Sequence, residues 1–177
     1  MNTVAVFCGS RIGLNHNYIE ETKKLAQMLA KNHVAVAYGG ASIGLMDIIA
    51  SEALANNGKV IGVMPKSFEE DGIVKHNLSQ LIWVEDLAER KKVLAKISDA
   101  FIILPGGYGT LDELFEMLAM KQIGLLHKKI CILNIDGFYD PLFELVIRMR
   151  SEKFITEEYF NYIFMAHSVE AIETYLF

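Results

Sequence analysis

LPGGYGTLDE, residues 104–113, is the stretch that decides which fold this sequence can adopt. Before it, the apolar run Ala100–Leu104 has the β-branched and aromatic composition of a buried strand. After it, Leu111, Leu114 and Leu118 recur at the spacing of a helix. A strand, a glycine turn and a helix therefore follow one another directly. Such a turn brings backbone N–H groups close to a ligand and directs the positive end of the helix dipole at it, which favours a phosphate.

Three side chains of this turn indicate its chemistry. The hydroxyl of Thr110 can cap the helix or bind a phosphate oxygen. Asp112 and Glu113 lie in the first turn of the expected helix, where acidic side chains commonly offset the helix dipole. A carboxylate repels a neighbouring phosphate, however, so this acidic pair predicts that a carboxylate acts on a part of the ligand away from its phosphate.

The composition is that of a well-packed globular protein. The 177 residues are 52% hydrophobic and 22% charged, with three prolines, and we expect one domain over residues 1–177. The net charge of −5, without a long basic cluster, argues against binding to a nucleic acid polymer. We expect a cytoplasmic protein without membrane contact, because we find neither a targeting segment nor an apolar run of membrane-spanning length. Cys8 and Cys131 lie in apolar runs and are expected to be buried thiols.

Strands and helices alternate along the chain. We expect strands at 3–8, 34–38, 59–64, 81–84, 100–104, 129–134 and 163–166. We expect helices at about 15–31, 44–57, 86–97, 110–124, 139–152 and 169–177, and a loop at 65–80. Near-continuous apolar strands imply a parallel sheet, so the predicted fold is α/β: a Rossmann-like, doubly wound parallel sheet with helices on both faces.

Three glycine turns, at residues 9–13, 39–44 and 106–109, each follow a strand and should meet at one edge of this sheet. Ligands of such sheets bind at that edge, near the point where the strand order reverses. The middle turn does not fit a dinucleotide site, because Met64-Pro65-Lys66 stands where an acidic residue is needed. Leu45-Met46 likewise stands where a Walker-type loop needs Lys-Ser/Thr. The histidines and cysteines lack metal-ligand spacing, so we expect no metal.

The helix after the central turn is unusually apolar. From Leu114 to Leu126 its only polar side chains are Glu116, Lys121 and Gln122. A helix that is apolar on nearly all sides is buried on nearly all sides, whereas a sheet covers only one face. We therefore expect a homodimer or a higher oligomer.

Arg90 and Lys91 follow the strand expected at 81–84 and should lie at the same edge of the sheet. A run of charges of this kind is commonly a solvated surface. At this position, however, an arginine can offer its fork of donors to a phosphate or to Glu113.

With these residues in place, the sequence resembles the Lonely Guy (LOG) family of cytokinin riboside 5′-monophosphate phosphoribohydrolases. The family's Pro-Gly-Gly-x-Gly-Thr-x-x-Glu motif is matched by residues 105–113, and its Arg-Lys pair by Arg90-Lys91. Shorter segments match at 8–10, 38–46 and 134–141. Members often carry an old label of lysine decarboxylase, but the sequence offers no pyridoxal-lysine context.

The resemblance implies hydrolysis of the N-glycosidic bond of an N6-substituted AMP to a free base and ribose 5-phosphate. It also implies that no cofactor is used and that the active sites of a homodimer form at the subunit boundary. In such proteins the arginine of the Arg-Lys pair and the glutamate of the motif are the catalytic pair, which in this sequence are Arg90 and Glu113. Glu113 would stabilise the positive charge on the breaking sugar and orient the water, and Arg90 would keep it ionised. The expected substrate-binding residues are Ser10, Gly39, Gly40, Met46, Arg90, Lys91, Gly106, Gly107, Tyr108, Gly109, Thr110, Leu111 and Asp112.

The sequence departs from the family pattern mainly around the base-binding end. Leu87-Ala88 replaces Met-His, Ala119-Met120 replaces Thr-Trp, and Asp47 replaces a glycine. A substrate-binding glutamate of the family falls near Gly72. Two alternatives stay open: a non-catalytic nucleotide-binding carrier module, and an enzyme that transfers the sugar instead of hydrolysing the bond.

Overall fold

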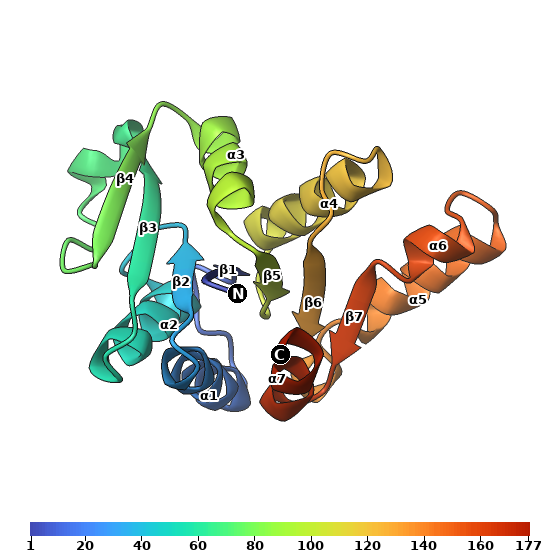
Figure 1. Ribbon diagram of the computed structural model, residues 1–177, viewed down its shortest axis with the longest axis horizontal. Coiled ribbons are helices and arrows are strands. Elements are labelled where there is room, and N and C mark those ends of the chain that lie inside the picture. Colours follow the sequence, from blue (N-terminus) through green and yellow to red (C-terminus); the bar gives the residue numbers. More distant parts are fainter.

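Seven strands form one sheet at the centre of the structure, a computed structural model that describes all 177 residues (Figure 1). All neighbouring strands are parallel, in the order β4-β3-β2-β1-β5-β6-β7. The strands are β1 (Thr3–Phe7), β2 (Ala35–Tyr38), β3 (Val60–Pro65), β4 (Gln80–Val84), β5 (Ala100–Ile103), β6 (Lys129–Leu133) and β7 (Ile163–Ala166). The predicted parallel α/β sheet is thereby confirmed.

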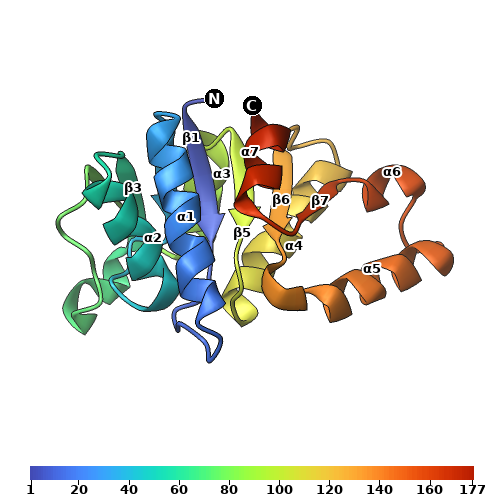
Figure 2. The ribbon, with the colours of Figure 1, turned by 90° about the horizontal axis from the view of Figure 1, so that it is seen from below.

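Helices cover both faces of the sheet, as its doubly wound order requires. They are α1 (Asn17–Lys31), α2 (Gly44–Ala55), α3 (Leu87–Ile97), α4 (Tyr108–Gln122), α5 (Asp140–Ser151), α6 (Glu157–Phe160) and α7 (Val169–Leu176). Alternate residues of β1 divide the core: Val4 and Val6 pack towards α1, α2 and α7, whereas Ala5 and Phe7 pack towards α3 and α4 (Figure 2). None of these helices combines the length and apolarity needed to cross a membrane.

Most element bounds agree with the sequence-based expectation to within a few residues, with two corrections. The expected loop at 65–80 contains the short 3-10 helix η1 (Lys66–Asp71) and an isolated antiparallel bridge between Ala41 and Val74. The N–H of Ser42 donates to the carbonyl of Ile73 at 2.7 Å, so long-range backbone bonds, which leave no periodic pattern, order this segment. The short helix α6 was also not expected.

The strand order reverses between β1 and β5. The chain proceeds from β1 outward to β4 and then starts again at β5 on the other side of β1. The turns after β1 and β5 therefore lie side by side: the N–H of Gly9 donates to the carbonyl of Pro105 at 3.0 Å. A Cβ on Gly9 would lie 3.3 Å from the Cα of Gly106, so a glycine lets the two turns approach this closely without a shift. The sheet thus joins two of the three glycine turns at its switch point.

The apolar helix α4 is only partly covered within the single chain. Phe115 is 38% exposed, and Ile123 and Leu125 just beyond the helix are each 68% exposed. Helices α5 and α6 extend away from the rest of the molecule (Figures 1 and 2). Between α4 and this extension lies an apolar groove of about 130 Å³. The groove is lined by Phe115, Leu118, Ala119, Gln122, Val146, Met149, Ile155, Tyr159, Tyr162 and Ile163.

Candidate functional site

The first turn of α4 carries a row of unpaired backbone donors. The helix begins at Tyr108 with Gly107 as its N-cap, and its first intrahelical bond runs from the N–H of Leu111 to the carbonyl of Gly107 at 3.1 Å. The N–H groups of residues 106–110 have no acceptor within the chain. Unpaired N–H groups at a helix N-terminus are the donors that bind anions.

Thr110 does not cap α4, and the expectation that it could is wrong. It is the third residue of the helix, and no side chain caps this terminus. Its hydroxyl lies against Gly106 instead. The approach is so close that an added Cβ on Gly106 would come within 2.1 Å of the Thr110 Oγ1. The Thr110 side chain is buried beneath the turn, and Gly106 has to be a glycine to leave room for it.

A cavity of about 310 Å³ opens beside these donors. The turn after β1 forms one wall, and the start of α2 holds that turn in place: the N–H of Leu45 donates to the carbonyl of Gly9 at 3.1 Å. Gly44 packs against the same turn, where an added Cβ would lie 2.3 Å from the carbonyl carbon of Ser10. The cavity is lined by Gly9, Ser10, Arg11, Ile12, Gly13, Tyr18, Leu45, Pro105, Gly106, Gly107 and Phe138. Three expected substrate-binding residues, Ser10, Gly106 and Gly107, are among them.

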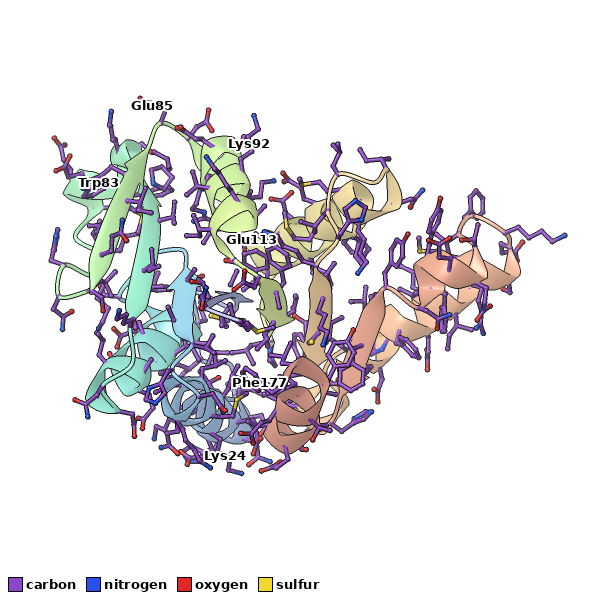
Figure 3. All side chains as sticks on the ribbon, viewed as in Figure 1. Lys24, Trp83, Glu85, Lys92, Glu113 and Phe177 are labelled. Atoms are coloured by element: carbon purple, nitrogen blue, oxygen red, sulfur yellow. The ribbon has the colours of Figure 1, made fainter.

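Arg90 and Glu113 form a buried ion pair that joins α3 to α4. Figure 3 labels Glu113, which lies where these two helices approach each other. The Nη2 of Arg90 donates to the Oε1 of Glu113 at 2.9 Å, and the two side chains are 18% and 8% exposed. Gly39 faces the same guanidinium: a Cβ there would lie 3.4 Å from the Nη1 of Arg90 and 3.4 Å from the Sδ of Met46. The Nε of Arg90 is buried and has no hydrogen-bond partner. The structure therefore brings Gly39, Met46, Arg90 and Glu113 together.

The pKa of the Glu113 carboxyl lies close to neutral pH. Burial raises its pKa to about 7, although the charge and hydrogen bond of Arg90 oppose this effect. Arg90 lowers the pKa of Glu113, which is the expected direction, but the loss of hydration has the larger effect. That Arg90 keeps Glu113 ionised during the reaction stays a prediction. A carboxyl with a pKa near 7 is well placed to accept a proton at physiological pH.

Lys91 and Asp112 lie beside this pair and bind each other. The Nζ of Lys91 donates to the Oδ2 of Asp112 at 2.8 Å and also pairs with Glu116. This contact links α3 to α4, and neither Lys91 nor Asp112 lines the cavity. Their expected contact with a substrate stays a prediction.

The remaining expected residues surround the start of α4 and the second glycine turn. Tyr108 is 95% exposed, Gly109 is exposed, and Leu111 is half-buried against the core on the α3 side. Gly40 has a φ of +79° and lies against Met64, so it shapes the turn.

Several residues near the site were not expected from the sequence to have a functional role. Tyr18 and Phe138 line the cavity with rings that meet edge-to-face, their centroids 5.7 Å apart. They are 120 positions apart in the chain, so no local pattern joins them. Arg11 also lines the cavity, and its place beside Ser10 in a glycine turn is a signal that could have identified it.

Comparisons with known proteins show which family the chain is similar to. The model of the family described as "possible lysine decarboxylase" matches residues 46–176. The chain is 41% identical over 152 residues to the probable cytokinin riboside 5′-monophosphate phosphoribohydrolase LOGL1 of Oryza sativa subsp. japonica, covering 86% of this chain and 68% of that protein. It is 40% identical over 156 residues to the cytokinin riboside 5′-monophosphate phosphoribohydrolase LOG of the same subspecies, covering 88% and 64%. The solved Moco carrier protein from Chlamydomonas reinhardtii matches with a TM-score of 0.75 at 18% identity, over 99% of this chain and 94% of that one, which shows the fold alone.

Proposed function

The chain belongs to the Lonely Guy family, and we propose that it hydrolyses the N-glycosidic bond of N6-substituted adenosine 5′-monophosphates to the free base and ribose 5-phosphate. One observation carries the proposal: the buried Arg90–Glu113 pair lies just beyond a helix N-terminus with unpaired N–H groups. Glu113 is five residues after Tyr108, which is about 7.5 Å along the axis of an α-helix. Glu113 thus lies further along the helix than the unpaired N–H groups, as a carboxyl that acts on the sugar of a nucleotide held by its phosphate would have to.

Different parts of the site bind the phosphate of the substrate and act on its sugar. The free N–H groups of residues 106–110 hold the phosphate, so that remote binding energy fixes the sugar in register. The bond between C1′ and the base nitrogen breaks, its electron pair leaves with the base, and positive charge develops on the sugar. The Glu113 carboxylate stabilises this charge and accepts a proton from the water whose oxygen bonds to C1′. The departing base takes up the proton that Glu113 accepted from the water, which returns the carboxylate to its starting state and balances the hydrolysis.

The decisive experiment is to incubate the protein with AMP and with isopentenyl-AMP and to measure free base and ribose 5-phosphate. Stoichiometric release of both products supports the hydrolase. Tight nucleotide binding without release would favour a carrier module, a candidate kept because solved carrier proteins share the fold. Exchange of a labelled free base into the nucleotide without net hydrolysis would indicate a sugar transferase.

We further propose that residues 1–177 act as one nucleotide-binding domain that works as a homodimer. The apolar groove beside α4 and the exposed Phe115 support this assembly, because such a surface favours burial against a second copy. We also propose a cytoplasmic location. It is supported by Cys8 and Cys131, which are both free and buried thiols, as expected in a reducing compartment.

A further inference from the structure

We propose that Arg11 closes over the 5′-phosphate and makes the site selective for phosphorylated substrates. This inference rests on the proposed function and adds a binding residue that the family motif does not include. Arg11 is the only charged residue among the eleven that line the 310 Å³ cavity beside the first turn of α4. A phosphate held by neutral N–H groups alone keeps most of its charge, and a guanidinium offers a fork of donors that matches it.

The backbone around Arg11 is held firmly on both sides. Gly9 is bonded to the turn after β5 through its N–H and to the start of α2 through its carbonyl. On its other side, Gly44 packs against the Arg11 backbone itself, because an added Cβ on Gly44 would lie 2.4 Å from the N of Arg11. Arg11 therefore has a defined starting point at the cavity wall, which limits the entropy lost when its side chain binds.

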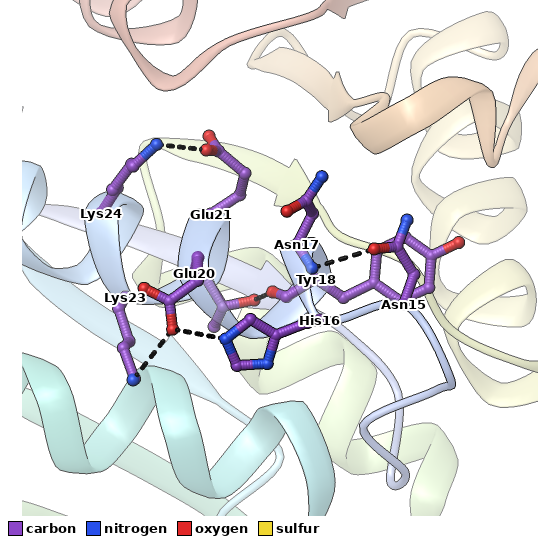
Figure 4. A network of polar contacts seen from close by, with 9 residues as sticks. Asn15, His16, Asn17, Tyr18, Glu20, Glu21, Lys23 and Lys24 are labelled. Carbon is purple, nitrogen blue, oxygen red and sulfur yellow. Dashed lines mark hydrogen bonds and ion pairs between the residues drawn. The ribbon is translucent and has the colours of Figure 1, made fainter.

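The Arg11 side chain itself has no partner in the chain. It is exposed and takes part in no side-chain hydrogen bond or ion pair. The charged residues at the start of α1 differ in this respect (Figure 4). There, Lys23 pairs with Glu20 at 3.2 Å and Lys24 pairs with Glu21 at 2.6 Å. Among the residues that line the cavity, Arg11 therefore supplies the only unpaired positive charge.

The walls of the cavity strengthen such a contact. Tyr18, Leu45 and Phe138 give it a largely apolar lining. Apolar walls lower the local dielectric, so a guanidinium–phosphate contact is less screened here than on an open surface. The neutral N–H groups then set the position of the phosphate, and the Arg11 guanidinium attracts its negative charge. A nucleoside without a phosphate lacks that charge, so Arg11 does not strengthen its binding.

The test compares Arg11→Ala, Arg11→Lys and a control, Lys59→Ala, which removes an exposed positive charge just before β3, at the opposite end of the strands. Calorimetric titration with ribose 5-phosphate needs no turnover, so it tests Arg11 even if no base is released. We expect Arg11→Ala to weaken this binding by about 10- to 100-fold. We expect Arg11→Lys to retain part of the affinity, and Lys59→Ala to bind like the native protein.

Steady-state kinetics then separate binding from a general structural effect. For Arg11→Ala we expect the KM for AMP to rise by a similar factor while kcat changes by less than about threefold. Native affinity of Arg11→Ala for ribose 5-phosphate would overturn the inference, and so would an equal loss in Lys59→Ala. If the native protein releases no base but Arg11→Ala binds ribose 5-phosphate more weakly, the hydrolase proposal fails and the assignment of Arg11 stands.

Discussion

The Nη2 of Arg90 donates a 2.9 Å hydrogen bond to the Oε1 of Glu113, and both side chains are largely withdrawn from solvent. The two residues come from helices that follow β4 and β5, so both helices start from the carboxyl ends of strands, and α4 starts beside the switch point between β1 and β5. The Glu113 carboxyl is buried, yet it lies close to a turn with unpaired N–H groups. Most of the expected properties of this protein follow from that arrangement.

The first prediction concerns the loss of the Glu113 carboxylate. We expect Glu113→Gln to lower kcat for base release on the order of 10²- to 10³-fold, because a preorganised charge that faces the transition state is lost. The measurement is base release from isopentenyl-AMP under saturating substrate. Glu52→Gln is the matched control, since Glu52 lies on α2 and bonds to Gln27 of α1. A Glu113→Gln protein with more than about a tenth of native turnover would contradict the assigned role.

The second prediction concerns pH. The ionised Glu113 is the active form and its pKa is about 7, so we expect kcat/KM to rise with pH and to level off above about pH 8. Arg90 lowers this pKa, and Arg90→Ala should therefore move the rising limb to higher pH in addition to reducing the rate. The residual activity of Arg90→Ala, followed from pH 5 to 10, tests this shift. An unchanged limb in that variant would assign the titration to another group.

The third prediction concerns stability. The pKa of Glu113 is about 7 in the folded state and has an ordinary value of 4.5, so the native state holds this proton more tightly. Its contribution to stability is therefore complete below pH 4.5 and is lost as the pH rises through 7. Glutamine mimics the protonated acid, so we expect Glu113→Gln to raise the free energy of unfolding at pH 8 by up to about 3 kcal/mol.

Urea unfolding at pH 8 and at pH 5 checks this stability difference. The advantage of Glu113→Gln over the native protein should be largest at pH 8 and fall below about 1 kcal/mol at pH 5, where the folded-state Glu113 is neutral and only its unfolded state is partly ionised. A variant that is less stable than the native protein at both pH values would show that the ion pair with Arg90 outweighs the cost of burying the charge.

The fourth prediction concerns the glycine turns. Gly106→Ala should disturb the turn, because its Cβ would lie 2.1 Å from the Oγ1 of Thr110. We expect a loss of roughly 1–3 kcal/mol in the free energy of unfolding, the usual cost of overpacking. Gly107→Ala is the control, since a Cβ there meets nothing within 4 Å. Thermal unfolding of the two variants decides the matter: equal melting temperatures would show that the turn adapts easily.

The fifth prediction concerns assembly. We expect the native protein to sediment with twice the 19.9 kDa mass of the chain at micromolar concentration. Leu118→Glu places a charge in the groove beside α4 and should give a folded monomer. Phe177→Glu is the control, because Phe177 is 56% exposed and lies at the end of α7, which covers the other face of the sheet. A native monomer, or a Leu118→Glu dimer, would contradict the proposed interface.

Local sequence patterns determined much of this protein. Apolar strands that alternate with helices predicted the doubly wound sheet, and the nine-residue motif at 105–113 predicted the turn, its free N–H groups and the acidic residues behind it. These features are local: they follow from the spacing of apolar residues and from glycine, which the chain order records directly.

Only the tertiary structure decided the rest. Of the two partners expected for Arg90, a phosphate or Glu113, it showed the contact with Glu113. It also paired Lys91 with Asp112 and brought Tyr18 and Phe138 together at the cavity wall. The raised pKa of Glu113 also follows from the tertiary structure, because it depends on how much water the packed helices exclude. Such contacts join residues that are distant in the chain, and burial is a property of the whole packed core, so neither can be read from local sequence.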